Sequence, residues 1–237
     1  MNTLSGFFFP PKCVFCGRAL AIGGPIDICG GCAGELPYFP GGRLFENSAA
    51  GNAACDRIVC ALRYAGPVRA ALAGFKFRNR REYGLTLAAL LCERLAREES
   101  GREYDYAACV PLTRRRARER GYNQSAVLAG HVARHLGLRC EGGLLIRDEQ
   151  ALRQSALRRH ERRANASRAF RVNESRAHAI NAARPAASHS INSLPLCGDR
   201  ILLVDDVATS MATINACAAA LKAAGAADVT GAVLASR

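Results

Sequence analysis

The chain has no tryptophan, and aromatic residues make up only 6% of its 237 residues. Its core must therefore be built largely from Ala, Leu, Val and Ile. No uninterrupted apolar run approaches the roughly 18 to 20 residues that cross a bilayer, which excludes a membrane-spanning helix. The first residues have neither a basic start nor a signal-peptide core, so we expect a cytoplasmic location. A hydrophobic content of 49% excludes disorder of the whole chain.

Lysine is also scarce, since Lys12, Lys76 and Lys222 are the only lysines among 33 basic residues. Twenty acidic residues leave a net charge of +13. Between Arg114 and Arg171, fifteen arginines stand against five acidic residues. This concentration favours a phosphate-rich partner, either a nucleotide or a nucleic acid. Solvated charge, with arginine raised by a GC-rich coding sequence, is the alternative.

The cysteines are numerous, eleven in all, but a disulfide framework is not expected in a cytosolic chain. Four of them form two Cys-x2-Cys pairs separated by twelve residues: Cys13, Cys16, Cys29 and Cys32. Two such pairs complete a closed tetrahedral thiolate site, which predicts a structural zinc ion. An iron-sulfur cluster and unligated thiols are the alternatives. A closed site leaves no coordination position open for catalysis.

The order of apolar segments predicts a zinc module at residues 1–36, a linker at 37–54 and a main domain at 55–237, with a flexible loop at 175–198. Strands are expected at residues 57–64, 106–110, 144–146, 200–204 and 228–234, and helices at 81–97, 124–136 and 209–224. Strands and helices that alternate in this way indicate an α/β fold with a parallel sheet flanked by helices.

The most informative segment runs from Ile201 to Thr213. Its four apolar residues predict a buried strand, and Asp205 and Asp206 are expected where that strand ends. Ligands of open α/β sheets bind at this end. The following Thr/Ser-rich turn can offer hydroxyls and N–H groups to a phosphate, while the carboxylates suit sugar hydroxyls or a magnesium ion. The segment therefore predicts a sugar-phosphate site; the alternative is that the two carboxylates only cap the strand and helix.

This segment resembles the phosphoribosyl pyrophosphate (PRPP) motif of type I phosphoribosyltransferases, and other motifs narrow the resemblance to the ComF family. That family has an N-terminal four-cysteine module, a proline at a strand end and an Arg-Gly-aromatic-Asn-Gln signature. The matching segments here are Val110-Pro111-Leu112, Arg116 to Arg120 with Gly121-Tyr122-Asn123-Gln124, Gln154-x2-Leu157, Arg162-x2-Asn165 and Ala169-Phe170. They cover nearly the whole chain in the family's order.

The resemblance implies a type I phosphoribosyltransferase-like fold that binds PRPP with Mg²⁺ and transfers the phosphoribosyl group to an unidentified acceptor. It implies catalytic roles for Asp205 and Asp206. The implied phosphate-binding residues are Ala208, Thr209, Ser210, Met211, Ala212 and Thr213. The implied pyrophosphate- or polyanion-binding residues are Arg114, Arg116, Arg120, Asn123 and Gln124.

The family is also linked to competence and DNA metabolism, so the same fold can serve a second function. In that interpretation the chain is a non-catalytic accessory protein that binds single-stranded DNA and works with DNA-uptake or repair proteins. The basic run at residues 114–118 would contact phosphates, or would be a solvated helix face.

Two positions depart from the family pattern. Met211 replaces a glycine of the phosphate loop, and Ala151 replaces a threonine three residues before the glutamine. A left-handed conformation at Met211 would cost about 1 to 2 kcal/mol. Whether the chain is an enzyme therefore stays open on the sequence.

Overall fold

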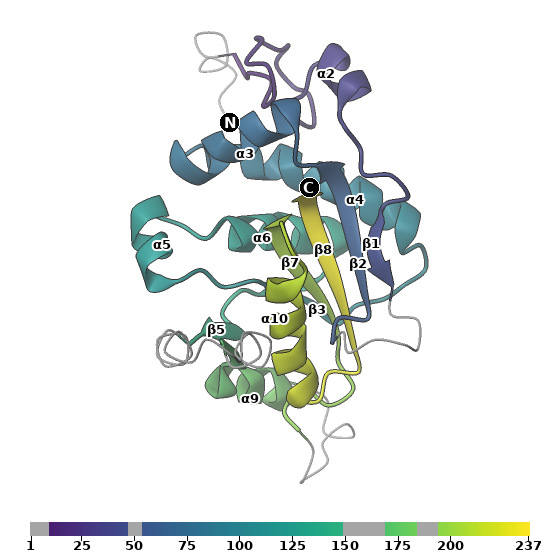
Figure 1. Ribbon diagram of the computed structural model, residues 1–237, viewed down its shortest axis with the longest axis vertical. Helices are drawn as coiled ribbons and strands as arrows, with labels where there is room; N and C mark the ends of the chain where they lie inside the picture. Colours follow the sequence, from purple (N-terminus) through teal and green to yellow (C-terminus); the bar gives the residue numbers. More distant parts are fainter. Residues whose placement is uncertain (1–9, 47–53, 149–168, 184–193) are drawn as a thin grey trace.

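The computed structural model describes residues 10–46, 54–148, 169–183 and 194–237. Its framework is a six-stranded sheet in the order β1-β2-β8-β7-β3-β4 (Figure 1). The strands are β1 (Arg43–Glu46), β2 (Arg57–Arg63), β8 (Asp228–Ser236), β7 (Arg200–Ala208), β3 (Tyr106–Cys109) and β4 (Arg139–Glu141). β1 is antiparallel to β2, and every other pair is parallel. The predicted parallel α/β fold is confirmed.

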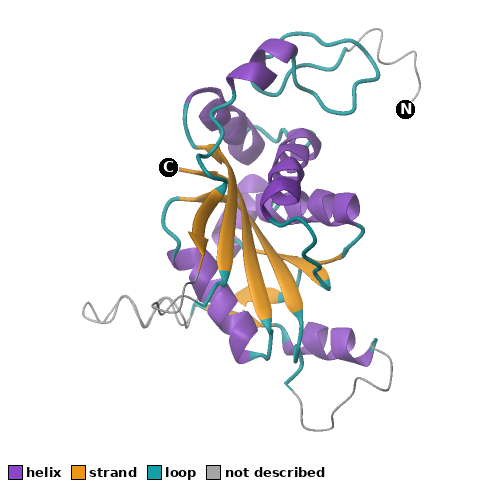
Figure 2. Ribbon diagram, turned by 90° about the vertical axis from the view of Figure 1, so that its right-hand side faces the viewer, coloured by secondary structure: helices purple, strands orange, loops and turns teal. Residues whose placement is uncertain are grey.

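Helices cover both faces of this sheet (Figure 2). The helices are α2 (Gly30–Glu35), α3 (Gly66–Phe77), α4 (Tyr83–Glu98), α5 (Arg114–Arg120), α6 (Gln124–Leu136), α9 (Glu174–Ala182) and α10 (Ala212–Ala223). On one face, Leu202 and Val204 pack with residues of α3, α4 and α6. On the other, Ile201 and Leu203 pack with α9, α10 and a hairpin of β5 (Leu145–Arg147) and β6 (Phe170–Val172). Burial on both faces explains why the central strands are uniformly apolar.

The connections change direction between β3 and β7, which are hydrogen-bonded neighbours. From β3 the chain passes through α6 to β4 on one side, and from β7 it passes through α10 to β8 on the other. Ligands of open α/β sheets bind outside the carboxyl ends of strands at such a switch point. The carboxyl ends of β3 and β7 therefore mark where a site is expected.

The four-cysteine module packs against α4. Cys13, Val14, Phe15 and Leu36 are buried in one cluster with Leu87 of that helix. The backbone N–H of Asp27 donates to the Thr86 hydroxyl at 2.9 Å, which ties the module to the same helix. Figure 1 shows the module at the end of the molecule near α3 and α4.

Three sequence predictions need correction. The flexible loop predicted at residues 175–198 is wrong over α9, because Asn173 caps this helix by accepting from the Arg176 N–H at 3.4 Å, and Ala177 and Ile180 are buried. Residues 184–193 lie outside the described residues. The predicted linker contains β1, which pairs with β2. β7 continues to Ala208, four residues beyond the predicted end, because β8 pairs with it that far.

The helix predicted at 124–136 has those bounds in the structure, with Asn123 and Gly137 as its caps. In the described part of the chain, no helix is both long and apolar enough to cross a membrane.

Candidate functional site

Two adjacent carboxylates lie in β7 close to the switch point. The prediction placed Asp205 and Asp206 beyond the end of the strand, but the longer β7 encloses them, and they are 8% and 7% exposed. The Ser125 hydroxyl donates to Asp205 Oδ1 at 2.8 Å, and the Asp206 N–H donates to the same oxygen at 2.9 Å. Lys76 Nζ lies 3.0 Å from Asp206 Oδ1. The pair is thus held by one hydroxyl and one ammonium group from two different helices.

Burial strongly affects the charge of Asp205. Burial first, and then the neighbouring charge of Asp206, raise the pKa of Asp205 to about 7. The hydrogen bonds from Ser125 and the Asp206 N–H, together with the charge of Lys76, oppose this rise. A carboxyl group whose ionisation is this strongly perturbed, at the ligand-binding edge of a sheet, is typical of functional sites.

Asn123 and Gln124 position the start of α6 beside this pair. The Asn123 side chain accepts from the Ser125 N–H at 3.1 Å and donates to the Val110 carbonyl at 3.0 Å, which joins α6 to the end of β3. Gln124 is fully buried, and its Oε1 accepts from Arg120 Nη1 at 2.8 Å. Both residues therefore have structural contacts, although Gln124 Nε2 is buried without a hydrogen-bond partner among the described residues. A direct role of either residue in anion binding stays a prediction.

The segment after β7 forms an open turn before α10. Thr209, Ser210 and Ala212 are exposed, Thr213 is half-buried and Ala208 is buried. The N-cap residue of α10, Met211, makes no side-chain hydrogen bond to the first N–H groups of the helix, which lie at this turn. Met211 is right-handed, with φ −72° and ψ −1°. The left-handed strain considered for the sequence is therefore absent.

The arginine run forms α5, which follows β3. Arg114, Arg115, Arg116 and Arg118 are exposed, and Arg115 pairs with Glu119 at 2.7 Å. This run is therefore an exposed, basic helix face near the carboxyl end of β3. Arg120 differs, because its guanidinium lies 5.1 Å from the ring centroid of Phe77, a side chain on α3 that is 71% exposed.

The four cysteines of the module come together as predicted. The sulfur atoms of Cys13, Cys16, Cys29 and Cys32 all lie within 4.8 Å of one another, and the Cys16 and Cys29 sulfurs are 3.7 Å apart. Tetrahedral zinc with bonds of about 2.3 Å to sulfur separates its ligands by about 3.8 Å, which fits this spacing.

Ionisation is favoured at two of the four thiols. Burial opposes the ionisation of Cys13, but hydrogen bonds from the backbone N–H groups of Cys29, Cys16 and Phe15 lower the pKa of its thiol to about 6. The hydrogen bond from the Cys32 N–H likewise lowers the pKa of Cys29. Thiolates are the form that binds metal. Burial first, and then the hydrogen bond with the Cys29 side chain, raise the pKa of Cys32 instead. The spacing of the sulfur atoms is therefore what shows that the four cysteines can hold a metal such as zinc.

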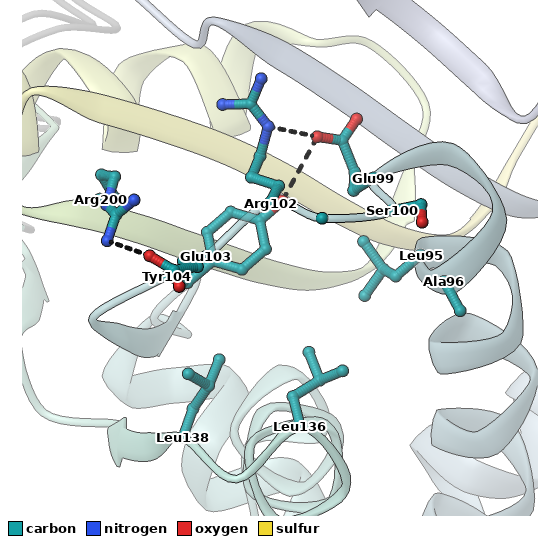
Figure 3. Close-up of a pocket in the computed structure, with 11 residues that line it drawn as sticks. Leu95, Ala96, Glu99, Ser100, Arg102, Glu103, Tyr104, Leu136, Leu138 and Arg200 are labelled. Atoms are coloured by element: carbon teal, nitrogen blue, oxygen red, sulfur yellow. Dashed lines mark hydrogen bonds and ion pairs between the residues drawn. The ribbon is translucent and has the colours of Figure 1, made fainter.

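A separate cavity of about 580 Å³ lies at the opposite, amino edge of the sheet (Figure 3). Leu95, Leu136 and Leu138 line one side, and Arg102 and Arg200 lie on the other. Arg102 pairs with Glu99 at 2.8 Å and Arg200 with Glu103 at 3.3 Å. No residue that the sequence singled out as a site residue lines this cavity.

Sequence reasoning missed Lys76 and Ser125, the two residues that contact the acidic pair. Ser125 directly follows the Asn-Gln signature, and Lys76 stands out as one of three lysines, so both had a weak signal. The motif residues Ala151, Gln154, Leu157, Arg162 and Asn165 lie outside the described residues.

The comparisons with known proteins cover nearly the whole chain. Over 222 residues it is 28% identical to DNA utilization protein YhgH of Salmonella typhimurium, an alignment that covers 92% of this chain and 86% of the relative. Over 238 residues it is 27% identical to competence protein F of Haemophilus influenzae, with 94% and 95% covered. No family model matches the chain.

One solved structure, TT1426 from Thermus thermophilus, is similar with a TM-score of 0.35 and 20% identity over 63% of this chain and 72% of that chain. This score is too low to define the fold, which rests on the strand order above. The protein is thus an α/β protein with a mainly parallel sheet and an N-terminal four-cysteine cluster. It is a homologue of the proteins named DNA utilization protein YhgH and competence protein F.

Proposed function

We propose that the protein binds PRPP at the carboxyl edge of the sheet, between β3 and β7. The observation that carries this proposal is the buried pair Asp205 and Asp206 at the switch point, directly before a turn with exposed hydroxyls and the start of α10. An acidic pair next to a helix N-terminus offers acceptors for sugar hydroxyls and donors for a phosphate.

In this proposal the ribose hydroxyls donate to the carboxylates, and the 5′-phosphate binds the turn at residues 208–213. Exposed Thr209 and Ser210 supply hydroxyls, and the right-handed Met211 leaves the following N–H groups in helical register. The diphosphate brings Mg²⁺ with it and lies toward the arginines of α5, Arg114, Arg116 and Arg120. The positive charge there offsets the charge of the diphosphate.

The proposed reaction is phosphoribosyl transfer. A nucleophilic acceptor forms a bond to the anomeric carbon, the bond from that carbon to the diphosphate oxygen breaks, and pyrophosphate leaves with the electron pair. The protein's part is to position the ribose and to stabilise the charge that develops on the leaving diphosphate. Asp205 and Asp206 act as positioning groups for the ribose.

Calorimetry with Mg-PRPP tests the binding step. Asp206→Asn should weaken binding, because the substitution removes a charged acceptor of ribose hydroxyls; loss of a hydrogen bond to a charged group costs about 1.5 to 3 kcal/mol, or tenfold and more. Asp56→Asn, which changes a carboxylate paired with Lys222 at the opposite edge, is the matched control and should bind as the wild type does. Wild-type protein that binds no Mg-PRPP at millimolar concentration would contradict the proposal.

Single-stranded DNA is a second candidate ligand, supported by a different observation. Arg120, at the end of α5, lies over the exposed ring of Phe77, and the same helix carries four exposed arginines. A basic helix that ends at an accessible aromatic ring suits a strand with unstacked bases. The relatives are also named for DNA utilization and competence.

Salt dependence tests this second candidate. Each phosphate contact contributes a log-log slope of about 0.7 for a single strand, so Arg116→Ala and Arg118→Ala should each flatten the slope by up to that amount. Arg97→Ala is the control, because Arg97 is an equally charged, exposed arginine on α4 that pairs with Glu93. Affinity that does not depend on salt, or that falls equally in all three variants, argues against α5 as a nucleic-acid surface.

A further inference from the structure

The charge that balances the acidic pair comes from a rare residue. The chain has thirty arginines but only three lysines, and Lys76 alone of these lies at the carboxyl edge of the sheet. Lys222 pairs with Asp56 at the amino edge, and Lys12 belongs to the four-cysteine module. Figure 1 shows α3, the helix that ends with Lys76 and Phe77, near the arrowheads of β7 and β8.

Lys76 forms an ion pair with only one of the two carboxylates. Its Nζ is 3.0 Å from Asp206 Oδ1, and the side chains of Lys76 and Asp206 are 14% and 11% exposed. Asp205 is satisfied by Ser125 and the Asp206 N–H, neither of which carries charge. A phosphorylated ligand that approaches this edge therefore meets a buried negative charge, and it needs a cation close to that charge in order to bind.

A lysine suits this position in a way that an arginine does not. Its ammonium group is a compact charge on a flexible four-carbon stem, with three donors that can turn to different acceptors. It can therefore release Asp206 to a sugar hydroxyl and reach an anion of the same ligand. An arginine would hold the carboxylate through a fixed two-pronged contact.

We infer that Lys76 is an anion-binding residue of this site, and that its ammonium group exchanges Asp206 for a phosphate or diphosphate group when a ligand binds. The inference rests on the proposed function in that both place a phosphorylated sugar at this edge. The inference adds that Lys76 couples the two parts of the ligand. The sugar hydroxyls bind the Asp206 carboxylate that Lys76 releases, and the phosphate or diphosphate group binds the ammonium group of Lys76.

Two probes separate these halves, inorganic pyrophosphate, which has no sugar hydroxyls, and Mg-PRPP. Calorimetry should show that Lys76→Met weakens both by about ten- to a hundredfold, the loss expected for one charge-assisted hydrogen bond. Lys76→Arg keeps the charge but holds Asp206 in a fixed contact, so it should recover only part of the pyrophosphate affinity. Lys222→Met removes the same charge from the Lys222–Asp56 pair and should leave both affinities unchanged.

Measurements in the Asp206→Asn variant distinguish two roles of Lys76, contact with the ligand and neutralisation of Asp206. Asp206→Asn should weaken PRPP binding but preserve or strengthen pyrophosphate binding, because it removes a negative charge that pyrophosphate does not use. Lys76→Met should still weaken pyrophosphate binding in that background. If its effect disappears there, Lys76 only neutralises Asp206 and the inference is wrong. The double variant also removes both ion-pair partners together, so it avoids leaving a lone buried carboxylate that could prevent folding.

The scarcity of lysine allows a direct spectroscopic measurement. Reductive methylation with ¹³C-formaldehyde keeps the lysine charge and labels only three side chains and the N-terminus. Pyrophosphate should shift the Lys76 signal and leave those of Lys12 and Lys222 in place. A Lys76 signal that does not respond while calorimetry detects binding would overturn the inference.

The outcomes separate the two proposals. If wild-type protein binds pyrophosphate through Lys76 but not Mg-PRPP, the proposed function fails and the anion-binding role of Lys76 stands. If Mg-PRPP binds equally well to the wild type and to Lys76→Met, the inference fails and the proposed function stands. If the wild type binds neither probe, both are wrong.

Discussion

The buried carboxylate Asp205 makes a clear prediction about stability. Its pKa of about 7 in the folded protein compares with an ordinary value of 3.8, so the folded state holds this proton more tightly than the unfolded chain does. The resulting stabilisation is fully present below pH 4 and is lost as the pH rises toward and past 7. At 1.36 kcal/mol for each pKa unit, the loss amounts to about 4 kcal/mol.

Asp205→Asn should remove this loss. The amide oxygen can still accept from the Ser125 hydroxyl and from the Asp206 N–H, but it carries no charge at any pH. Urea denaturation at pH 8 should therefore show a higher free energy of unfolding for the variant, with a gain of up to about 4 kcal/mol. At pH 4 the two proteins should differ little.

Other titrating groups lie near Asp205, so the comparison needs a control. Asp206, Lys76, Cys109 and Cys217 all interact electrostatically with it. They are present in both proteins, and the difference between wild type and variant isolates Asp205. Asp56→Asn removes a carboxylate that is ion-paired at the amino edge and should not raise stability at pH 8. An Asp205→Asn protein that is no more stable than the wild type at pH 8 would refute the reasoning.

Three further predictions concern the metal, the turn and the start of α6. Elemental analysis should find one zinc per chain. Cys16→Ser should lower the free energy of unfolding by about 3 kcal/mol, since loss of a structural metal is among the most destabilising changes. Wild-type protein without zinc would contradict this prediction. Met211→Gly should change Mg-PRPP affinity by no more than about twofold, because Met211 has no left-handed strain to relieve, and a larger gain would indicate side-chain crowding. Asn123→Ala should cost about 1 to 2 kcal/mol in urea denaturation through loss of the α6 cap, and an unchanged midpoint would show that the cap contributes nothing.

Helices and strands could be predicted from the sequence where local residues determine their bounds. The helix at 124–136 could be predicted to the residue, because Asn123 caps its start and Gly137, with φ 70°, ends it. The central strands could be predicted because they are buried on both faces and are uniformly apolar. The end of β7 could not, because it depends on pairing with Ser236 of β8, which is a tertiary contact.

Helix α9 was missed for a related reason. Of its nine residues only Ala177 and Ile180 are buried, so it has little of the apolar stripe that identifies a helix in sequence. Its start depends on the Asn173 cap, a short signal within a segment rich in small residues.

The candidate site shows the same division. Asp205 and Asp206 could be predicted because they directly follow a run of four apolar residues, whereas Lys76 and Ser125 reach them from helices distant in the sequence. No periodicity or motif spacing indicates that the last turn of α3 meets β7. Such a contact follows from the order of the strands, since β2 and β3 flank the pair β8-β7 and the helices between them must cross it.

The contacts of the acidic pair also suggest why carboxylates, and not apolar side chains, occupy positions 205 and 206. Well-packed apolar side chains at positions 205 and 206 would continue β7 without a desolvation cost, and replacing a buried ion pair in that way is often neutral or stabilising. The structure instead surrounds two carboxylates with a hydroxyl, a backbone N–H and a lysine, and still leaves Asp205 with a pKa raised to about 7. Groups that are oriented in advance and incompletely neutralised gain their full interaction only when a ligand supplies the missing donors. The instability that Asp205 causes at neutral pH is therefore what a ligand carrying hydroxyls next to an anion would relieve, and its relief would appear as ligand-induced stabilisation that is lost in Asp205→Asn.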